Sequence, residues 1–191
     1  DYSQAAFLAV LGCVLGGVTV TGLNPESKQG DKVIMDILQR CGGKCKAVDG
    51  GLKFSRSLLK ATEIDLADCP DLGPILFTLG CFCSGETILR NAGRLRIKES
   101  DRIAAMQSEL EKMGARIQVD GDTVYIYGTA LRAPERPLNG HNDHRIVMAL
   151  AVAAAAGGLP ATILGAEAVN KSWPAFWQVL QSLGERVEFE E

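Results

Sequence analysis

Three short segments of the chain carry side chains of the types that bind anions and transfer protons. The first runs from Arg94 to Arg102 and contains Lys98 and Glu99. Lys98 and Arg102 are four residues apart and can share one face of a helix, whose N-terminus adds positive potential. This combination suits a bound anion beside a carboxylate that moves a proton. A solvated, capped helix start with an internal ion pair explains the same spacing.

The second segment is Asn142-Asp143-His144-Arg145, at the expected start of another helix. An arginine there can hold a phosphate or carboxylate through two parallel hydrogen bonds, helped by amides of the first turn. The alternative is an ordinary N-cap at Asn142 or Asp143 with Arg145 exposed. His141 and His144 are the only histidines, and no acidic or cysteine cluster of metal-ligand spacing accompanies them. We therefore expect no bound metal.

Two single residues complete the candidate set. Asp71 lies in Cys-Pro-Asp-Leu-Gly-Pro before an apolar segment, where the pattern favours a helix cap over a general base. Lys171, in Val-Asn-Lys-Ser-Trp-Pro, holds about the same place before the last helix that Lys98 holds earlier, and is otherwise a solvated loop lysine. If equivalent loops converge on one face, four cations surround one polyanionic small molecule: Lys98, Arg102, Arg145 and Lys171.

An internal repeat of about 70 residues supplies the elements that must position these side chains. Apolar helices are expected to begin at Asp1, Asp71 and Asp143, with spacings of 70 and 72 residues. Each helix ends at glycine and leads into a short β-branched strand and then a second helix. In the middle unit the second helix is amphipathic, with a stripe formed by Ile103, Met106, Leu110 and Met113.

Glycines at positions 42, 114 and 184 end the second helices. In the first two units a strand, a turn and a partner strand follow, whereas the third expected strand, residues 186–189, has no hairpin partner and leaves an open edge. The prediction is an α/β fold: a pseudo-threefold domain of α-β-α-β-β units with the apolar first helices at its centre. Residues 1–191 form one domain, with units of about 1–69, 70–141 and 142–191.

Composition narrows the class of protein. With 191 residues, 47% of them hydrophobic, the chain can bury a substantial core, which excludes a disordered protein. A net charge of −3 and scattered basic residues argue against a nucleic-acid partner. Glycines interrupt the apolar stretches 5–20 and 147–164, so no membrane partner is expected.

Cysteine usage indicates the compartment. The chain has six cysteines and neither a C-x-x-C pair nor a secretory signal, which favours reduced, mostly buried thiols and a cytoplasmic protein. Cys81 and Cys83 flank Phe82 in an apolar helix and are interpreted as core residues.

Four strings together resemble the EPSP synthase family: Arg-Leu-Arg-Ile-Lys-Glu-Ser-Asp-Arg, Asn-Asp-His-Arg-Ile-Val-Met-Ala, Pro-Asp-Leu-Gly-Pro and Asn-Lys-Ser-Trp-Pro. The resemblance runs in order through essentially all 191 residues. Members of this family are enolpyruvyl transferases of the shikimate pathway, in which two inside-out α/β barrel domains of three units each close on shikimate 3-phosphate and phosphoenolpyruvate. The resemblance implies that this chain is the C-terminal run of one domain, without the short N-terminal segment that completes it or the inserted second domain.

The resemblance also implies roles for individual residues. Asp71 would act as general base on the 5-hydroxyl of shikimate 3-phosphate, with Lys98 contacting the same hydroxyl and assisting proton transfer. Glu99 would exchange a proton with the methylene of phosphoenolpyruvate. The phosphate and carboxylate of phosphoenolpyruvate would be held by Arg102, Arg145 and Lys171. No cofactor is implied, and Arg94 and Arg96 receive no role.

Parts of the family pattern do not occur in this chain. The phosphoshikimate-binding Lys-Ser, Arg and Ser-Gln elements and the glycine-rich loop lie outside the matching run, so the chain alone is expected to be inactive. A stand-alone anion-binding module is one alternative. A transferase acting on UDP-N-acetylglucosamine is another, although that branch lacks the Lys-Glu-Ser-Asp-Arg and Asp-His-Arg motifs.

Overall fold

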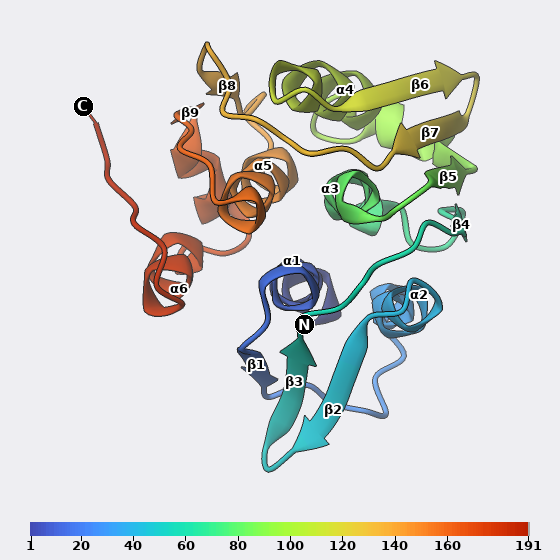
Figure 1. The fold of residues 1–191 in the computed structure, drawn as a ribbon, viewed down its shortest axis with the longest axis vertical. Coiled ribbons are helices and arrows are strands. Elements are labelled where there is room, and N and C mark those ends of the chain that lie inside the picture. Colours follow the sequence, from blue (N-terminus) through green and yellow to red (C-terminus); the bar gives the residue numbers. More distant parts are fainter. Residues whose placement is uncertain (191) are drawn as a thin grey trace.

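The computed structural model describes residues 1–190 as a mixed α/β fold (Figure 1). Its α-helices are α1 (Tyr2–Leu15), α2 (Ile34–Arg40), α3 (Gly73–Phe82), α4 (Arg102–Lys112), α5 (His144–Gly157) and α6 (Phe176–Ser182). Its strands are β1 (Val18–Thr21), β2 (Lys44–Val48), β3 (Gly51–Ser55), β4 (Glu63–Asp65), β5 (Glu86–Arg90), β6 (Arg116–Asp120), β7 (Thr123–Tyr127), β8 (Leu138–Asn139) and β9 (Ile163–Leu164). Short 3₁₀ helices cover Gly30–Val33, Pro70–Leu72, Ala92–Ile97 and Ala166–Lys171.

The predicted repeat is visible in the order of the elements. Helix, strand, helix and hairpin follow one another as α1-β1-α2-β2-β3 and again as α3-β5-α4-β6-β7, and a third run begins as α5-β9-α6. Both predicted hairpins form, with Val48 opposite Gly51 and Asp120 opposite Thr123. The strand expected at residues 186–189 does not form. Its alternating pattern suits a strand, but an isolated strand cannot satisfy its backbone hydrogen bonds, and no described strand pairs with it.

The sheets are linked by the segments that leave each unit. The strand orders are β1-β3-β2, β4-β5-β7-β6 and β8-β9. β4 follows the first hairpin and pairs parallel with β5, and β8 follows the second hairpin and pairs parallel with β9. Each hairpin therefore continues into the sheet of the following unit, which fixes the position of one unit against the next.

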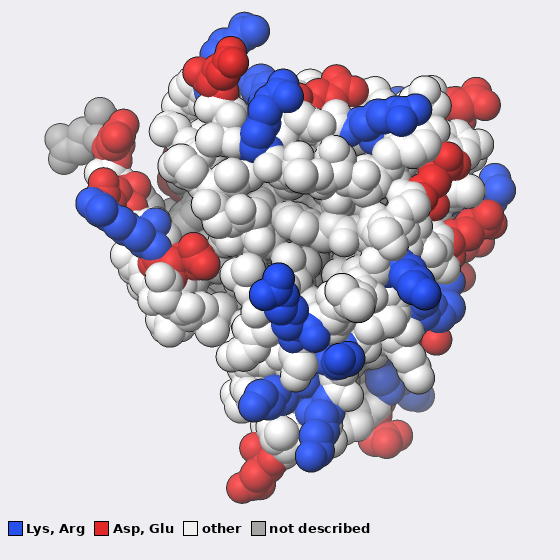
Figure 2. Space-filling view, viewed as in Figure 1, with Lys and Arg blue, Asp and Glu red and all other residues white. Residues whose placement is uncertain are grey.

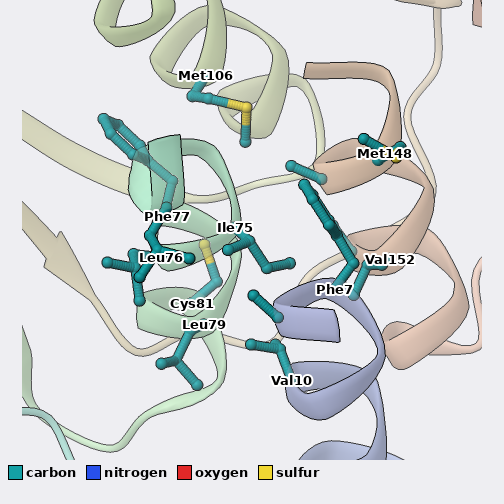
Figure 3. Close-up of a cluster of buried hydrophobic side chains, with 14 of the residues drawn as sticks. Phe7, Val10, Ile75, Leu76, Phe77, Leu79, Cys81, Met106, Met148 and Val152 are labelled. Atoms are coloured by element: carbon teal, nitrogen blue, oxygen red, sulfur yellow. The ribbon is translucent and has the colours of Figure 1, made fainter. Parts of the chain in front are cut away.

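The core lies between the three first helices, which pack against one another at the centre of the fold (Figure 1). Phe7 and Val10 of α1 and Ile75 of α3 point into this space, as Figure 3 shows, and Met148 and Val152 of α5 are also buried. These helices are apolar on nearly every side because other elements surround them, as expected for buried helices. The predicted stripe of α4 is also confirmed, since all four of its members are buried.

The starts of the three central helices lie close together. Arg145, in the first turn of α5, contacts Asp71, just before α3. Gln4, in the first turn of α1, donates to the backbone oxygen of Ser172, next to Lys171. The helix N-termini and the loops that carry the candidate residues therefore meet at one end of the bundle, where the partial positive charges of the helix ends add together.

None of the helices in residues 1–190 is long and apolar enough to cross a membrane. On the face that Figure 2 shows, charged side chains lie mostly around the rim and the centre is largely uncharged.

The cysteines divide into one exposed thiol and five buried ones, and all are free. Burial raises the pKa of Cys81 to about 12 and also raises the pKa of Cys45, but Cys45 lies on the exposed strand β2 and so can be reached by a reagent. We expect the folded protein to give one fast-reacting equivalent with a thiol reagent such as DTNB, because the thiolate must form and be reached. Cys45→Ser should remove that fast phase, and two or more fast equivalents in the folded protein would contradict the described packing.

Candidate active site

Asp71 stands at the centre of the candidate site. Its Oδ1 lies 3.2 Å from Lys98 Nζ and 3.2 Å from Arg102 Nη1, and its Oδ2 lies 3.6 Å from Arg145 Nη2. Burial opposes ionisation of this carboxyl, but the charges of Arg145, Lys98 and Arg102 outweigh burial and lower its pKa. Asp71 is therefore a carboxylate at neutral pH, and 38% of its side chain remains accessible.

The pattern-based preference for Asp71 as a helix cap is wrong. The 3₁₀ turn Pro70–Leu72 contains Asp71 and delays the start of α3 to Gly73, so the cap position falls on Leu72, which makes no side-chain capping bond. The carboxylate of Asp71 is left free to meet the cations.

Arg102 and Asp143 form a buried ion pair behind Asp71. Arg102 Nε lies 2.8 Å from Asp143 Oδ2 and Nη2 lies 3.2 Å from Oδ1, with the two side chains 2% and 0% exposed. Ser100 Oγ donates to the same carboxylate at 2.9 Å. Burial opposes ionisation of Asp143, but the hydrogen bonds and charge of Arg102 lower its pKa.

Asp143 has a second task, because its Oδ1 also accepts from the backbone N–H of Arg145 and so caps α5. The N-cap interpretation of this segment is confirmed for Asp143, but Arg145 is not exposed as that interpretation expected, since 13% of its side chain is accessible. Arg102, by contrast, directs its hydrogen bonds to Asp143 and Asp71 from a buried position. This geometry lets Arg102 orient two carboxylates and add positive charge beneath the site.

Lys98 reaches Asp71 from a loop. It follows the 3₁₀ helix Ala92–Ile97 in an extended conformation, and α4 begins only at Arg102 with Asp101 as its N-cap. The prediction that Lys98 and Arg102 share a helix face is therefore wrong. They converge because both contact the same oxygen of Asp71.

Glu99 joins the last two members to the network. Its Oε2 lies 3.2 Å from His144 Nδ1 and 3.6 Å from Lys171 Nζ, and 41% of its side chain is exposed. Lys171 also donates to the backbone oxygen of Asn142 at 2.5 Å. Burial lowers the pKa of His144, more than the nearby Glu99 raises it, so this imidazole is neutral at neutral pH.

The structure thus brings all six predicted side chains into one connected group: Asp71, Lys98, Glu99, Arg102, Arg145 and Lys171. Its four cations exceed its two carboxylates, and Asp143 supplies a third carboxylate from below. Anions are attracted to such a group, and its carboxylates are placed to move protons beside a bound anion.

Sequence reasoning missed Ser100 and Asp31 and did not place His144 in the network. Asp31 is buried, accepts from Ser3 Oγ at 2.5 Å and has a raised pKa because of that burial. The contact between His144 and Glu99 joins residues 45 positions apart, so no local spacing indicates it. Ser100 could have been found from the sequence, because it lies between Glu99 and Arg102 in the candidate segment Arg94 to Arg102.

Glu99, Asp143 and His144 place possible ligand atoms within 4.8 Å of one another. The oxygens of Asp143 already accept from Arg102, Ser100 and the N–H of Arg145. The group is therefore hydrogen-bonded within itself, and the absence of a metal remains a prediction.

Comparison with known proteins decides the family. The family model for "EPSP synthase (3-phosphoshikimate 1-carboxyvinyltransferase)" matches residues 1–180. The chain belongs to the EPSP synthase family. Its motifs had suggested this family, and the match confirms it.

Relatives within the EPSP synthase family are clearly similar. The 3-phosphoshikimate 1-carboxyvinyltransferase of Clostridium kluyveri is 40% identical over 193 residues, which covers 98% of this chain and 44% of that protein. The corresponding protein of Clostridium acetobutylicum is 44% identical over 186 residues, covering 96% of this chain and 42% of that protein. The chain therefore spans less than half the length of these curated relatives.

Solved structures agree with the EPSP synthase fold. The EPSP synthase of Acinetobacter baumannii, at 2.37 Å, superposes with a TM-score of 0.77 and 27% identity, covering 95% of this chain and 45% of that one. The enolpyruvyl transferase NikO of Streptomyces tendae gives 0.76 at 19% identity, over 98% of this chain and 44% of that one, and so supports the fold alone.

Proposed function

We propose that this chain supplies one half of an EPSP synthase active site, which transfers the enolpyruvyl group of phosphoenolpyruvate to the 5-hydroxyl of shikimate 3-phosphate and releases phosphate. The observation that carries the proposal is the ionised Asp71 held among Lys98, Arg102 and Arg145, with Glu99 and Lys171 beside them. The placing of proton-transfer carboxylates inside a cationic group is what the reaction requires.

In the addition step, Asp71 takes the proton of the 5-hydroxyl, and the oxygen of that hydroxyl bonds to C2 of phosphoenolpyruvate. Lys98 stabilises the negative charge that develops on that oxygen. Glu99 gives a proton to C3, which completes a tetrahedral intermediate. In the elimination step C3 returns a proton to Glu99, the C2–C3 double bond forms again and the bond between C2 and the phosphate oxygen breaks. The leaving phosphate takes the proton that Asp71 had accepted, so both carboxylates return to their starting state.

Arg145 and Lys171 hold the phosphate and carboxylate of phosphoenolpyruvate. The resemblance implied that Arg102 also holds phosphoenolpyruvate. Its side chain is only 2% exposed and bonds to Asp143 and Asp71, so we propose instead that it orients these two carboxylates and adds positive charge beneath the site. When the substrate anions enter, they compete with Asp71 for Arg145 and Lys98. The pKa of Asp71 then rises from its lowered value, which makes this carboxylate a stronger base once substrate is bound.

The proposal of a complementary part rests on the length of the curated relatives, of which this chain spans less than half, and the repeat supports it. β5 is paired on both sides, by β4 and β7, whereas β1 has only β3 and β9 has only β8 among the described strands. A short N-terminal segment of the same enzyme would pair with these edges, and an inserted second domain would bring the phosphoshikimate-binding groups. The free thiols suit a reducing compartment, so we place the protein in the cytoplasm.

The test is phosphate release from phosphoenolpyruvate and shikimate 3-phosphate. It compares the chain alone with the completed enzyme, meaning this chain together with the complementary part of an EPSP synthase, joined or co-expressed. We expect turnover only in the completed enzyme, since loss of even one preorganised donor costs about a hundredfold or more. Turnover by the chain alone would contradict the half-site. Turnover only with UDP-N-acetylglucosamine would favour that transferase, and anion binding without turnover in either form would favour a binding module.

A further inference from the structure

Glu109 is a buried carboxylate that lies outside the group described above. It sits on α4, and only 3% of the residue is exposed. Its Oε2 accepts from Lys112 Nζ at 2.7 Å and from the backbone N–H of Asn139 at 2.9 Å, and its Oε1 lies 3.0 Å from His141 Nε2. A buried carboxylate is costly unless it is fully hydrogen-bonded, and this one is held on both oxygens.

Glu109 is ionised at neutral pH. Burial opposes ionisation, but the hydrogen bonds from Lys112, Asn139 and His141 outweigh it and lower the pKa. Its bonds to Asn139, the last residue of β8, and to His141 are therefore charge-assisted, which makes them stronger than bonds between neutral groups.

The segment that Glu109 holds has an unfavourable backbone. His141 and Asn142 both have positive φ angles, 52° and 51°, in the left-handed region that side chains other than glycine rarely adopt. Asparagine tolerates this region better than histidine does, so the strain falls mainly on His141. Such backbone persists only where surrounding contacts impose it. Here Glu109 binds the ring of His141 and the N–H of Asn139, two residues before it.

The left-handed turn leads directly into the candidate site. The backbone oxygen of Asn142 accepts from Lys171, and the next three residues are Asp143, His144 and Arg145. α4 holds this turn at two points, with Arg102 at its first residue and Glu109 about 10 Å further along the helix axis. Displacement of the turn at either point would move the guanidinium of Arg145 away from Asp71.

We propose that Glu109 is a positioning residue, which holds the left-handed turn of His141 and Asn142 so that Arg145 and Lys171 face the bound anion. The effect on phosphoenolpyruvate rests on the proposed function, whereas the effect on the turn does not.

The test is Glu109→Gln in the completed enzyme, with Glu111→Gln as the matched control. Glu111 is an exposed residue of the same helix. Two readouts are needed: the KM values for both substrates, and amide hydrogen exchange at Asn139 and Arg145, which requires no substrate. Glu109→Gln should raise the KM for phosphoenolpyruvate about tenfold, the scale of one lost charge-assisted bond, and leave the KM for shikimate 3-phosphate within about twofold. Exchange at the Arg145 amide should quicken about tenfold, and the control should change neither readout.

A second variant separates positioning from simple stabilisation. His141→Gly removes the backbone strain, because glycine adopts positive φ freely, and it also removes the ring that Glu109 contacts, which leaves the N–H of Asn139 as the contact of Glu109 with this segment. In that background Glu109→Gln should change the KM for phosphoenolpyruvate by only about twofold. If Glu109→Gln still raises the KM for phosphoenolpyruvate about tenfold in that background, Glu109 does not act through the turn. The same conclusion follows if Glu109→Gln alone lowers the melting temperature but leaves both KM values and the exchange at Arg145 unchanged. If the completed wild-type enzyme fails to turn over these substrates, the proposed function fails. The role of Glu109 is still tested in that case: faster exchange at the Arg145 amide in Glu109→Gln supports it, and unchanged exchange overturns it.

Discussion

Asp71→Asn should reduce the kcat of the completed enzyme by about a hundredfold to ten thousandfold, the usual contribution of a positioned general base. Asparagine preserves the size of the side chain and can accept a hydrogen bond from Lys98 or Arg102, but it cannot take the proton of the 5-hydroxyl. The measurement is steady-state phosphate release. Asp68→Asn is the matched control, since Asp68 is an exposed carboxylate three residues away and should leave kcat within about twofold.

The same variant separates catalysis from binding. Removal of the Asp71 charge leaves Lys98, Arg102 and Arg145 with one fewer carboxylate to contact. The site then attracts anions at least as strongly as before, so the KM for phosphoenolpyruvate should stay the same or fall. A kcat within twofold of the wild type would exclude Asp71 as the base. A large rise in KM with kcat unchanged would instead make it a binding group.

Arg102→Met should destabilise the folded protein by about 3–5 kcal/mol, because it leaves Asp143 buried without its cation. Equilibrium unfolding in urea is the measurement. Arg96→Met is the control: Arg96 is 38% exposed and lies 3.8 Å from Asp101, so its loss should cost less than about 1 kcal/mol.

The cost of Arg102→Met should depend on pH in a defined direction. In the wild type, Arg102 holds the pKa of Asp143 below its usual range, so the stability that this carboxylate contributes is present at neutral pH. That contribution is lost only as the pH falls through the lowered value. In the variant, burial without Arg102 raises the pKa of Asp143, and the folded state then favours the protonated form. The difference between the two proteins should therefore shrink as the pH falls toward about 4. A difference that stays constant from neutral pH to pH 4 would contradict the ion pair as its source.

Local patterns were enough to predict the repeated elements. The hairpin turns at Asp49 and Asp120 and the stripe of α4 depend on neighbouring residues only, and all of them form. The prediction of a strand at residues 186–189 was wrong because a strand also needs a partner strand, which an alternating pattern within one segment does not supply. The prediction that Asp71 caps a helix was wrong because Asp71 lies within the 3₁₀ turn Pro70–Leu72, so that α3 begins two residues later, at Gly73.

The candidate site required contacts across units. Arg102 and Asp143 are 41 positions apart, and no spacing rule connects them. The motifs nonetheless named the six side chains that meet, because each lies at or next to the start of a helix or turn and the repeat brings those starts together. Glu109 was visible in the pattern and was not recognised: it lies three residues after Met106, on the buried stripe of α4, where a carboxylate needs partners.

The most direct test of the half-site is a crystal structure of the completed enzyme with phosphoenolpyruvate and shikimate 3-phosphate bound. We expect the phosphate and carboxylate of phosphoenolpyruvate to lie against Arg145 and Lys171, and the 5-oxygen of shikimate 3-phosphate to lie within hydrogen-bond distance of Asp71. Away from these residues the structure has an open hollow of about 540 Å³ lined by Ala67, Asn91, Gly93, Arg94, Ile97 and Asp122. Phosphoenolpyruvate bound in that hollow, or anywhere else away from Arg145 and Lys171, would contradict the proposed function.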